Sequence, residues 1–98
     1  MDDKFGLKAE LLKEIIDIAK KYDVHKVIIY GSRARGDYKE RSDIDLAFEG
    51  GRASEFALEV DEDTNTLLQF DIVNLNDPVQ QELRKSIHDE GIVIYEKV

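Results

Sequence analysis

The segment from Val27 to Glu49 places the tightest limits on what this chain can fold into. It begins with a short apolar run, Val27-Ile28-Ile29-Tyr30, that leads into Gly31-Ser32. Ten residues later it continues as Asp43-Ile44-Asp45. A continuous apolar run ended by glycine indicates a buried strand followed by a turn. The polar–apolar alternation from Ser42 onward indicates a second strand with one buried face.

The other segments predict helices and two more strands around this pair. Apolar residues at three- and four-residue steps predict an amphipathic helix over residues 5–22. We further expect a short helix over 53–60, a strand over Leu67–Leu75, a helix from Asp77-Pro78 to Gly91, and a last strand over 92–95. This order predicts an α/β (α+β) fold, a mixed sheet with helices packed against it.

Length and composition limit the classes of protein to consider. The 98 residues suit a single domain over 1–98, without cysteine and without an apolar run long enough for a membrane span or signal peptide. We therefore expect a cytoplasmic protein with no membrane partner. The formal net charge is −8, and residues 52–98 hold 4 basic and 11 acidic groups. Such a chain should repel DNA and RNA, so no direct nucleic-acid partner is expected.

Asp43 and Asp45 are the first candidate functional pair. Residues two apart on a strand face the same side, so their carboxylates should stand next to each other. A divalent cation such as Mg²⁺ relieves the repulsion between two close carboxylates and typically takes one or two of them together with substrate phosphates. An ordinary half-buried strand with an acidic solvent face would show the same spacing, and that alternative stays open.

Asp71 adds a third carboxylate, in the middle of the strand predicted over Leu67–Leu75. Its apolar neighbours predict burial, and a buried aspartate needs a partner or an ion. If this strand lies beside the Asp43–Asp45 strand, three carboxylates converge. Three could hold two metal ions about 3.5–4 Å apart, the arrangement for phosphoryl displacement. Asp71 would then be a ligand and a general base for the attacking hydroxyl, unless it is simply an outward-facing strand residue.

The turn at Gly31-Ser32 is a candidate phosphate site. Glycine allows a close approach of the backbone, and Ser32 offers a hydroxyl and an N–H to phosphate oxygens. If Ser32 caps a short helix through Arg35, that end of the helix favours anions. Arg33 and Arg35 could neutralise phosphate charge. A Gly-Ser pair after a strand is also an ordinary turn, but the chain has no Walker A or Gly-x-Gly-x-x-Gly motif to suggest another nucleotide site.

The remaining candidates are weaker. His25 and His88 are far apart in the sequence and are expected on the surface rather than as ligands. Tyr30, Tyr38 and Tyr95 are interpreted as structural residues. Tyr38 lies in the motif loop, where it could stack on a base or be modified. No Ser-His-Asp grouping is evident in the sequence.

Taken together, the Gly-Ser-x10-Asp-x-Asp pattern, the Gly-Ser-Arg-Ala-Arg-Gly segment and the later strand aspartate resemble the nucleotidyltransferases of the DNA polymerase β superfamily. More closely, the chain is similar to the minimal nucleotidyltransferases, the antitoxins of HEPN toxin–antitoxin systems. The resemblance extends from the first helix to the closing Glu-Gly-Ile-Val-Ile-Tyr and implies a four-stranded mixed sheet. It makes Asp43, Asp45 and Asp71 the metal and catalytic residues, and Gly31 and Ser32 the triphosphate-binding residues.

The resemblance also implies an activity and a partner. Antitoxins of this type are thought to transfer AMP from ATP, with Mg²⁺, to a tyrosine of the HEPN toxin, a ribonuclease that this silences. Larger members of the superfamily add domains that bind the acceptor. With 98 residues this chain has no room for one, so a protein that brings its own surface fits as the acceptor.

Two other functions stay open at this point. The chain could be an antitoxin that neutralises its partner by stoichiometric binding alone, through the acidic residues 52–98. It could also be a generic acidic α/β domain whose carboxylates only face water, whereas a glycosyltransferase would need a longer chain. Self-association is possible through the apolar face of helix 5–22 or through the last strand.

Overall fold

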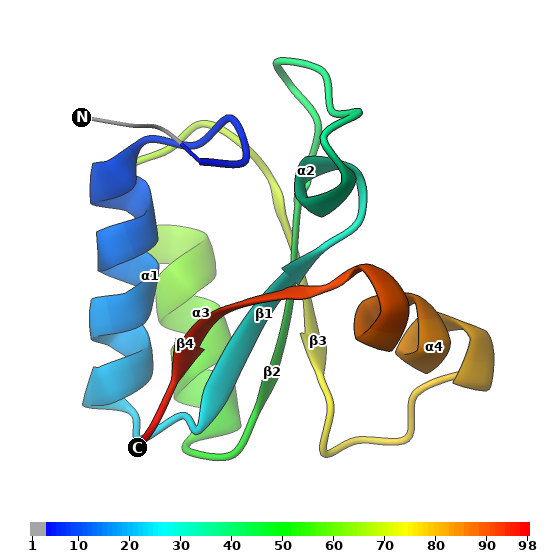
Figure 1. Cartoon of the computed structure of the whole chain (residues 1–98). Coiled ribbons are helices and arrows are strands. Elements are labelled where there is room, and N and C mark those ends of the chain that lie inside the picture. The colour runs from blue at the N-terminus through cyan, green and yellow to red at the C-terminus, as the bar shows by residue number, and fades with distance from the viewer. Residues whose placement is uncertain (1–3) are drawn as a thin grey trace.

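In the computed structural model, which describes residues 4–98, four strands form one mixed sheet (Figure 1). The strands are β1 (Lys26–Tyr30), β2 (Ile44–Glu49), β3 (Phe70–Asn74) and β4 (Ile92–Glu96). Their order in the sheet is β3-β2-β1-β4. β1 runs antiparallel to both β2 and β4, whereas β2 and β3 are parallel. The predicted mixed sheet of four strands is confirmed.

Within the described residues four helices accompany the sheet: α1 (Ala9–Lys21), α2 (Ser32–Arg35), α3 (Ala53–Asp63) and α4 (Gln81–Glu90). α3 provides the connection between the parallel strands β2 and β3, which a short turn could not bridge. α2 is a single turn directly after β1 (Figure 1). The predicted alternation of helices and strands is therefore present in full.

The larger part of the core lies on the sheet face that α1 and α3 cover. Ile44, Leu46 and Phe48 of β2 point to this side, and the Phe48 ring lies 4.8 Å from that of Phe56 in α3. Burying an apolar side chain of this size contributes about 1.5–3 kcal/mol, so this layer provides most of the hydrophobic stabilisation. The buried members are Leu7, Leu11, Ile15, Ile18, Ala19, Val24, Val27, Ile29, Ile44, Leu46, Phe48, Phe56 and Val60.

The opposite face of the sheet is covered more sparsely. Ile87 of α4 packs there against Tyr30 and Ala47, and half-buried apolar residues surround this small cluster. Because successive strand residues alternate between faces, Asp45 shares this face with Ala47. The sheet therefore separates a large apolar core on one side from α4 and the aspartates on the other.

Two helices begin later than the sequence pattern predicts. Residues 4–7 form a tight turn in place of the first turn of a helix, and the φ angles of Phe5 and Gly6 are 60° and 67°. Those angles are incompatible with a right-handed helix, so α1 begins only at Ala9. α4 begins at Gln81, which leaves Pro78 in the preceding connection instead of at the first helical turn.

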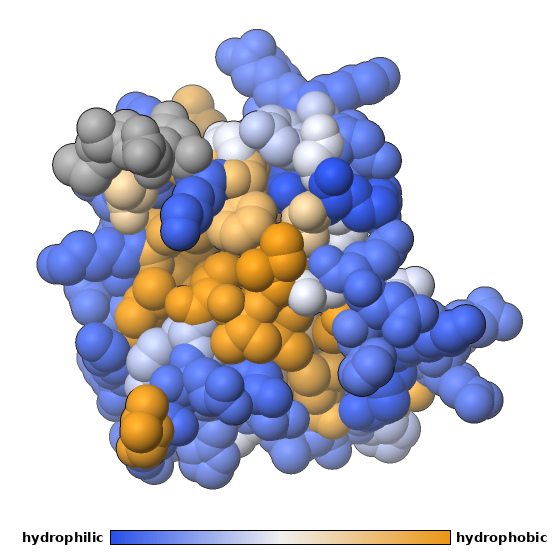
Figure 2. Space-filling model, in the orientation of Figure 1, coloured by the Kyte–Doolittle hydropathy of each residue, from blue (hydrophilic) through white to orange (hydrophobic). Residues whose placement is uncertain are grey.

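Figure 2 shows apolar side chains gathered on the face of the molecule where β4 lies between α1 and α4 in Figure 1. β4 is an edge strand, and its Ile92 and Val93 are 41% and 47% exposed. Within residues 4–98, no helix has the length and apolar character needed to cross a membrane.

Candidate active site

Three strands bring Tyr30, Asp45 and Asp71 into one row across the sheet. Tyr30 of β1 is the register partner of Asp45 in β2, and Asp45 is the partner of Asp71 in β3. Directly paired residues on neighbouring strands point to the same face. Asp43 lies two residues before Asp45, just ahead of the first residue of β2. The sheet therefore places the three predicted carboxylates as neighbours at one end of β2 and β3.

The negative charges of Asp43 and Asp71 act on the Asp45 carboxyl between them. Burial raises the pKa of the Asp45 carboxyl above its ordinary value, and the negative charges of Asp71 and Asp43 raise that pKa further. The positive charges of Arg35 and Arg33 oppose the shift in part. Asp45 is thus a half-buried acid whose ionised form needs additional positive charge.

Asp71 differs from its predicted environment, because its side chain is exposed and the expected burial is wrong. β3 is an edge strand and has a neighbouring strand on one side only. The apolar residues next to it in the sequence, Phe70 and Ile72, point to the other face and pack against the main core. An aspartate at this position can therefore reach a ligand from the solvent side.

The donor set suits a hard divalent cation, since Mg²⁺ prefers carboxylate oxygens together with phosphates and water. The side chains do not yet form a closed ligand cage. Across residues 4–98, no three carboxylate or imidazole groups surround one point as metal ligands would. Asp43, Asp45 and Asp71 are therefore aligned by the sheet but would have to draw together around an ion.

Gly31 brings the predicted phosphate turn against these carboxylates. Its φ and ψ angles of 74° and −153° fall in a region of the backbone map that essentially only glycine occupies. A Cβ atom added there would overlap the carboxylate of Asp45. The turn and Asp45, which lies fourteen residues after Gly31 in the sequence, are thus in direct contact in space.

Ser32 is the first residue of α2 and is half-buried. The expectation that its side chain caps this helix is wrong, because Gly31 occupies the N-cap position and no side-chain cap hydrogen bond is made. Ser32 nevertheless lies next to the glycine that touches Asp45. Its hydroxyl and N–H thus belong to the turn that adjoins the carboxylates.

Among the predicted site residues, Arg33 departs most from its expected role, which was to bind phosphate. Its side chain is only 2% exposed, and its guanidinium group donates to the backbone carbonyls of Phe5, Gly6, Glu40 and Ser42. These four carbonyls accept five hydrogen bonds, two of them at Ser42, so none of the five N–H donors of the guanidinium is left over for a triphosphate. Arg33 still contributes positive charge near Asp45, but from inside the protein.

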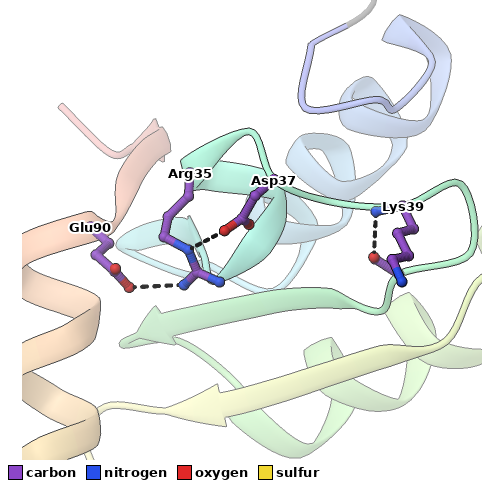
Figure 3. A network of polar contacts seen from close by, with 5 residues as sticks. Arg35, Asp37, Lys39 and Glu90 are labelled. Carbon is purple, nitrogen blue, oxygen red and sulfur yellow. Dashed lines mark hydrogen bonds and ion pairs between the residues drawn. The ribbon is translucent and has the colours of Figure 1, made fainter.

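Arg35 remains on the surface, in the network of Figure 3. Its Nε donates to Asp37 at 3.2 Å, and its Nη1 donates to Glu90 at the end of α4 at 3.2 Å. Exposed ion pairs of this kind contribute little to stability, because water and salt screen their charges. A phosphate group could therefore displace these partners from the Arg35 guanidinium at small cost.

Tyr30 is the residue near the carboxylates to which sequence reasoning gave only a structural part. Its side chain is 6% exposed, and burial, followed by the charges of Asp71 and Asp45, raises its pKa to about 12. The phenol thus stays protonated and can donate a hydrogen bond at physiological pH. Only the pairing of β1 with β2 reveals its position, because Tyr30 and Asp45 are fifteen residues apart in the sequence.

A family model described as "Polymerase beta, Nucleotidyltransferase" matches residues 13–98, which include every residue of the candidate site. The chain belongs to this nucleotidyltransferase family. The resemblance stated from the motif is thereby confirmed at the level of the family, and the fold of this nucleotidyltransferase is the one that the resemblance implied.

One relative of this nucleotidyltransferase is the Methanocaldococcus jannaschii protein named "Putative protein adenylyltransferase MJ0604". The two are 32% identical over 96 residues, which cover 86% of this chain and 94% of the relative. The match thus extends over nearly all of both proteins.

Solved structures with a similar fold include a toxin–antitoxin with AMP-PNP, at a TM-score of 0.65 and 18% identity. The match covers 88% of this nucleotidyltransferase and 73% of that chain. A Y104A mutant of the toxin–antitoxin MntA-HpeT matches at a TM-score of 0.67 and 18% identity, over 87% and 72% of the two chains. At such identities the similarity establishes the fold.

Proposed function

We propose that this nucleotidyltransferase is an antitoxin that transfers AMP from ATP to a hydroxyl group, a tyrosine of a HEPN ribonuclease toxin, and so neutralises the toxin. One domain, residues 1–98, would carry the reaction. The observation that carries the proposal is the contact of Gly31 with the Asp45 carboxylate, beside the paired Asp71. This contact joins a phosphate-binding turn to a row of carboxylates, as nucleotidyl transfer requires.

The bond changes of the transfer assign a role to each residue. The acceptor oxygen attacks the α-phosphorus of ATP, the bond from that phosphorus to the bridging oxygen breaks, and pyrophosphate leaves. Asp71, the exposed carboxylate, would take the proton of the acceptor hydroxyl as a general base. Gly31 and Ser32 would bind the triphosphate through the backbone and hydroxyl, with Arg35 as an additional cation.

Mg²⁺ would be held by Asp43, Asp45 and Asp71. The fit rests on the oxygen donor set and on the raised pKa of Asp45, whose ionised form a nearby cation would stabilise. When bound, Mg²⁺ supplies positive charge to the phosphates and makes the acceptor hydroxyl more acidic. Two ions fit the count of three carboxylates.

The proposed partner follows from the relatives rather than from the site itself. The M. jannaschii relative is named for protein adenylylation, which makes a protein hydroxyl the expected acceptor. Two structures with the same fold are toxin–antitoxins, and one of them is described with AMP-PNP. A protein acceptor also agrees with the acidic surface, which disfavours a nucleic acid.

The test uses ATP labelled on its α-phosphate, Mg²⁺, the purified protein and its candidate toxin. We expect label on the toxin, and we expect the Asp43→Asn/Asp45→Asn variant to lose it while its fold and its complex with the toxin persist. The matched control removes two acidic charges from exposed positions on α1, on the other face of the sheet, with Glu10→Gln/Asp17→Asn. That control should label the toxin as well as the original protein.

The alternative is an antitoxin that neutralises by stoichiometric binding alone. It is supported by the concentration of net negative charge in residues 52–98. A tight complex that neutralises the toxin without any transfer of label would support this alternative and reject the enzymatic proposal for that pair.

A further inference from the structure

The Arg33 guanidinium is a buried cation without an acidic partner, and it lies inside the motif. Arg33 makes five hydrogen bonds within residues 4–98, and all of them end on backbone carbonyls. The ion pairs found in this part of the chain do not include it. Burying a cation away from any opposite charge is costly, and these five hydrogen bonds offset that cost only while the carbonyls stay in place around it.

The segments that Arg33 joins are the two halves of the motif. Arg33 directly follows Ser32 of the phosphate turn, and its Nη2 donates at 2.8 Å to the carbonyl of Ser42, the residue before Asp43. Its Nε donates to the same carbonyl at 3.1 Å. This two-pronged contact on one oxygen fixes both distance and orientation, which a single flexible donor would not do. One side chain therefore ties the phosphate turn to the first carboxylate.

The N-terminal turn closes the arrangement from the other side. Arg33 Nη1 donates at 3.0 Å to the carbonyl of Phe5, and the Arg33 guanidinium lies 5.0 Å from the centre of the Tyr38 ring. A Cβ atom on Gly6 would overlap that ring. The Arg33 clasp thus consists of residues 5–6, Arg33, Tyr38, and the carbonyls of Glu40 and Ser42.

We propose that Arg33 is a positioning residue for nucleotidyl transfer: through the clasp it sets the distance between the phosphate turn and Asp43, and it never touches the nucleotide. This inference rests on the proposed function, since it needs a reaction to position. Misplacing a reacting group by about 1 Å can cost about 100-fold in rate. Loosening the clasp should therefore lower kcat more than it raises KM for ATP.

The first experiment measures transfer of labelled AMP by Arg33→Ala and Arg33→Lys. We expect kcat to fall about 100-fold in Arg33→Ala and less in Arg33→Lys, which keeps the charge but loses the fork. Free guanidinium at millimolar concentration, far below the molar range that unfolds proteins, should partly restore Arg33→Ala. It should not restore Asp45→Asn. Wild-type kcat in both arginine variants would overturn the proposal.

A second measurement follows the loop itself and needs no activity. Trypsin can cut after Lys39 in the exposed part of the motif loop, and we expect cleavage there to be faster in Arg33→Ala. The matched control is Arg41→Ala, an exposed arginine in the same loop, which should leave kcat and this cleavage unchanged. Unchanged cleavage in Arg33→Ala would overturn the clasp. Faster cleavage with full kcat would show that Arg33 stabilises the loop without positioning groups for the reaction, and this would overturn the proposal.

Gly6→Ala tests the clasp from the side of the N-terminal turn and keeps Arg33 intact, in case the arginine variants do not fold. It should push on Tyr38 and lower kcat about tenfold, with faster cleavage after Lys39. Normal kcat and cleavage in a folded Gly6→Ala protein would contradict the proposal. If the original protein transfers no AMP at all, the proposed function fails, and the cleavage measurement still decides whether the clasp exists.

Discussion

Gly31 is the residue at which the two halves of the motif touch, and its backbone angles are suited only to glycine. Gly31→Ala should lower the free energy of unfolding by about 1–3 kcal/mol, because alanine is strained at these angles. Its methyl group would also displace the Asp45 carboxylate, so we expect AMP transfer to fall about 100-fold. Urea denaturation and the labelled-ATP assay measure the two effects.

Gly36 provides the matched control, because it also has a positive φ of 94° but faces open space. Gly36→Ala should cost about 1–2 kcal/mol of stability through backbone strain alone and leave the transfer rate nearly unchanged. If Gly31→Ala lost no more activity than Gly36→Ala, the contact between the turn and Asp45 would have no catalytic importance.

Asp45 links stability to pH. Burial and the neighbouring Asp71 and Asp43 charges raise the pKa of Asp45 in the folded protein. A raised pKa means that the folded state holds this proton more tightly than the unfolded state. The protonated Asp45 carboxyl therefore contributes fully to the free energy of unfolding below its unfolded pKa. This contribution is lost as the pH rises through its folded pKa. Without metal, ionised Asp45 is thus destabilising at neutral pH.

We therefore expect Asp45→Asn to melt at a higher temperature than the original protein at pH 7 in the absence of Mg²⁺. The difference should disappear as the pH falls well below the unfolded pKa of about 3.9, where the carboxyl is protonated in both states. Mg²⁺ with an ATP analogue should raise the Tm of the original protein more than that of the variant. Asp61→Asn, on the exposed end of α3, controls for the loss of one charge. A lower Tm for Asp45→Asn at pH 7 would contradict the argument.

Among the elements, α4 depends on very few apolar contacts. Ile87 is its one buried residue, and it packs against Tyr30 and Ala47 on the same face of the sheet as the carboxylates. Ile87→Ala should lower the free energy of unfolding by about 2–4 kcal/mol, through lost burial and the cavity that remains. Lys85→Ala, at an exposed position of the same helix, should change it by less than about 0.5 kcal/mol. Equal effects in urea denaturation would show that α4 is not anchored through Ile87.

The strands could be predicted from the sequence because their pattern is strong and local. The apolar run before Gly31 and the alternation after Ser42 correspond to β1 and β2, each within two residues of its predicted start. Helix starts were harder to predict. Residues 5–8 continue the apolar pattern of α1, but positive φ angles at Phe5 and Gly6 stop the helix, and backbone angles are not evident from hydrophobic spacing.

For the site residues, too, the sequence predicts some features and misses others. That Asp43 and Asp45 face the same side follows from the two-residue period of a strand alone. That Asp71 lies next to them follows once β3 pairs with β2. The burial of Arg33 could not be predicted, because its partners are backbone carbonyls brought in from residues 5–6 and 40–42. Every residue has a backbone carbonyl, so a sequence pattern cannot show which carbonyls an arginine will bind. The exposure of Asp71 depended on strand order, which places β3 at an edge.

The whole molecule carries a net charge of −8, with 22 acidic and 14 basic side chains. Mutual repulsion of like charges destabilises a compact state and is screened by salt. Raising NaCl from low to moderate concentration should therefore raise the Tm by about 2–5 °C for a chain of this size. Sucrose at equal osmolality controls for solvent effects that do not depend on charge. A falling Tm would mean that surface ion pairs such as Arg35–Glu90 outweigh the repulsion.

The pairing of β1 with β4 also affects the order in which the parts of the molecule fold. Val27 pairs with Tyr95, so the strand that leads into Gly31 is completed on one side by the last strand of the sheet. Closing so long a stretch of chain costs entropy and slows folding. α4, which packs beneath Tyr30, is made just before that strand. We therefore expect the turn at Gly31-Ser32 to become rigid only at the end of folding, so that chains in which β4 is not yet made would lack the proposed activity.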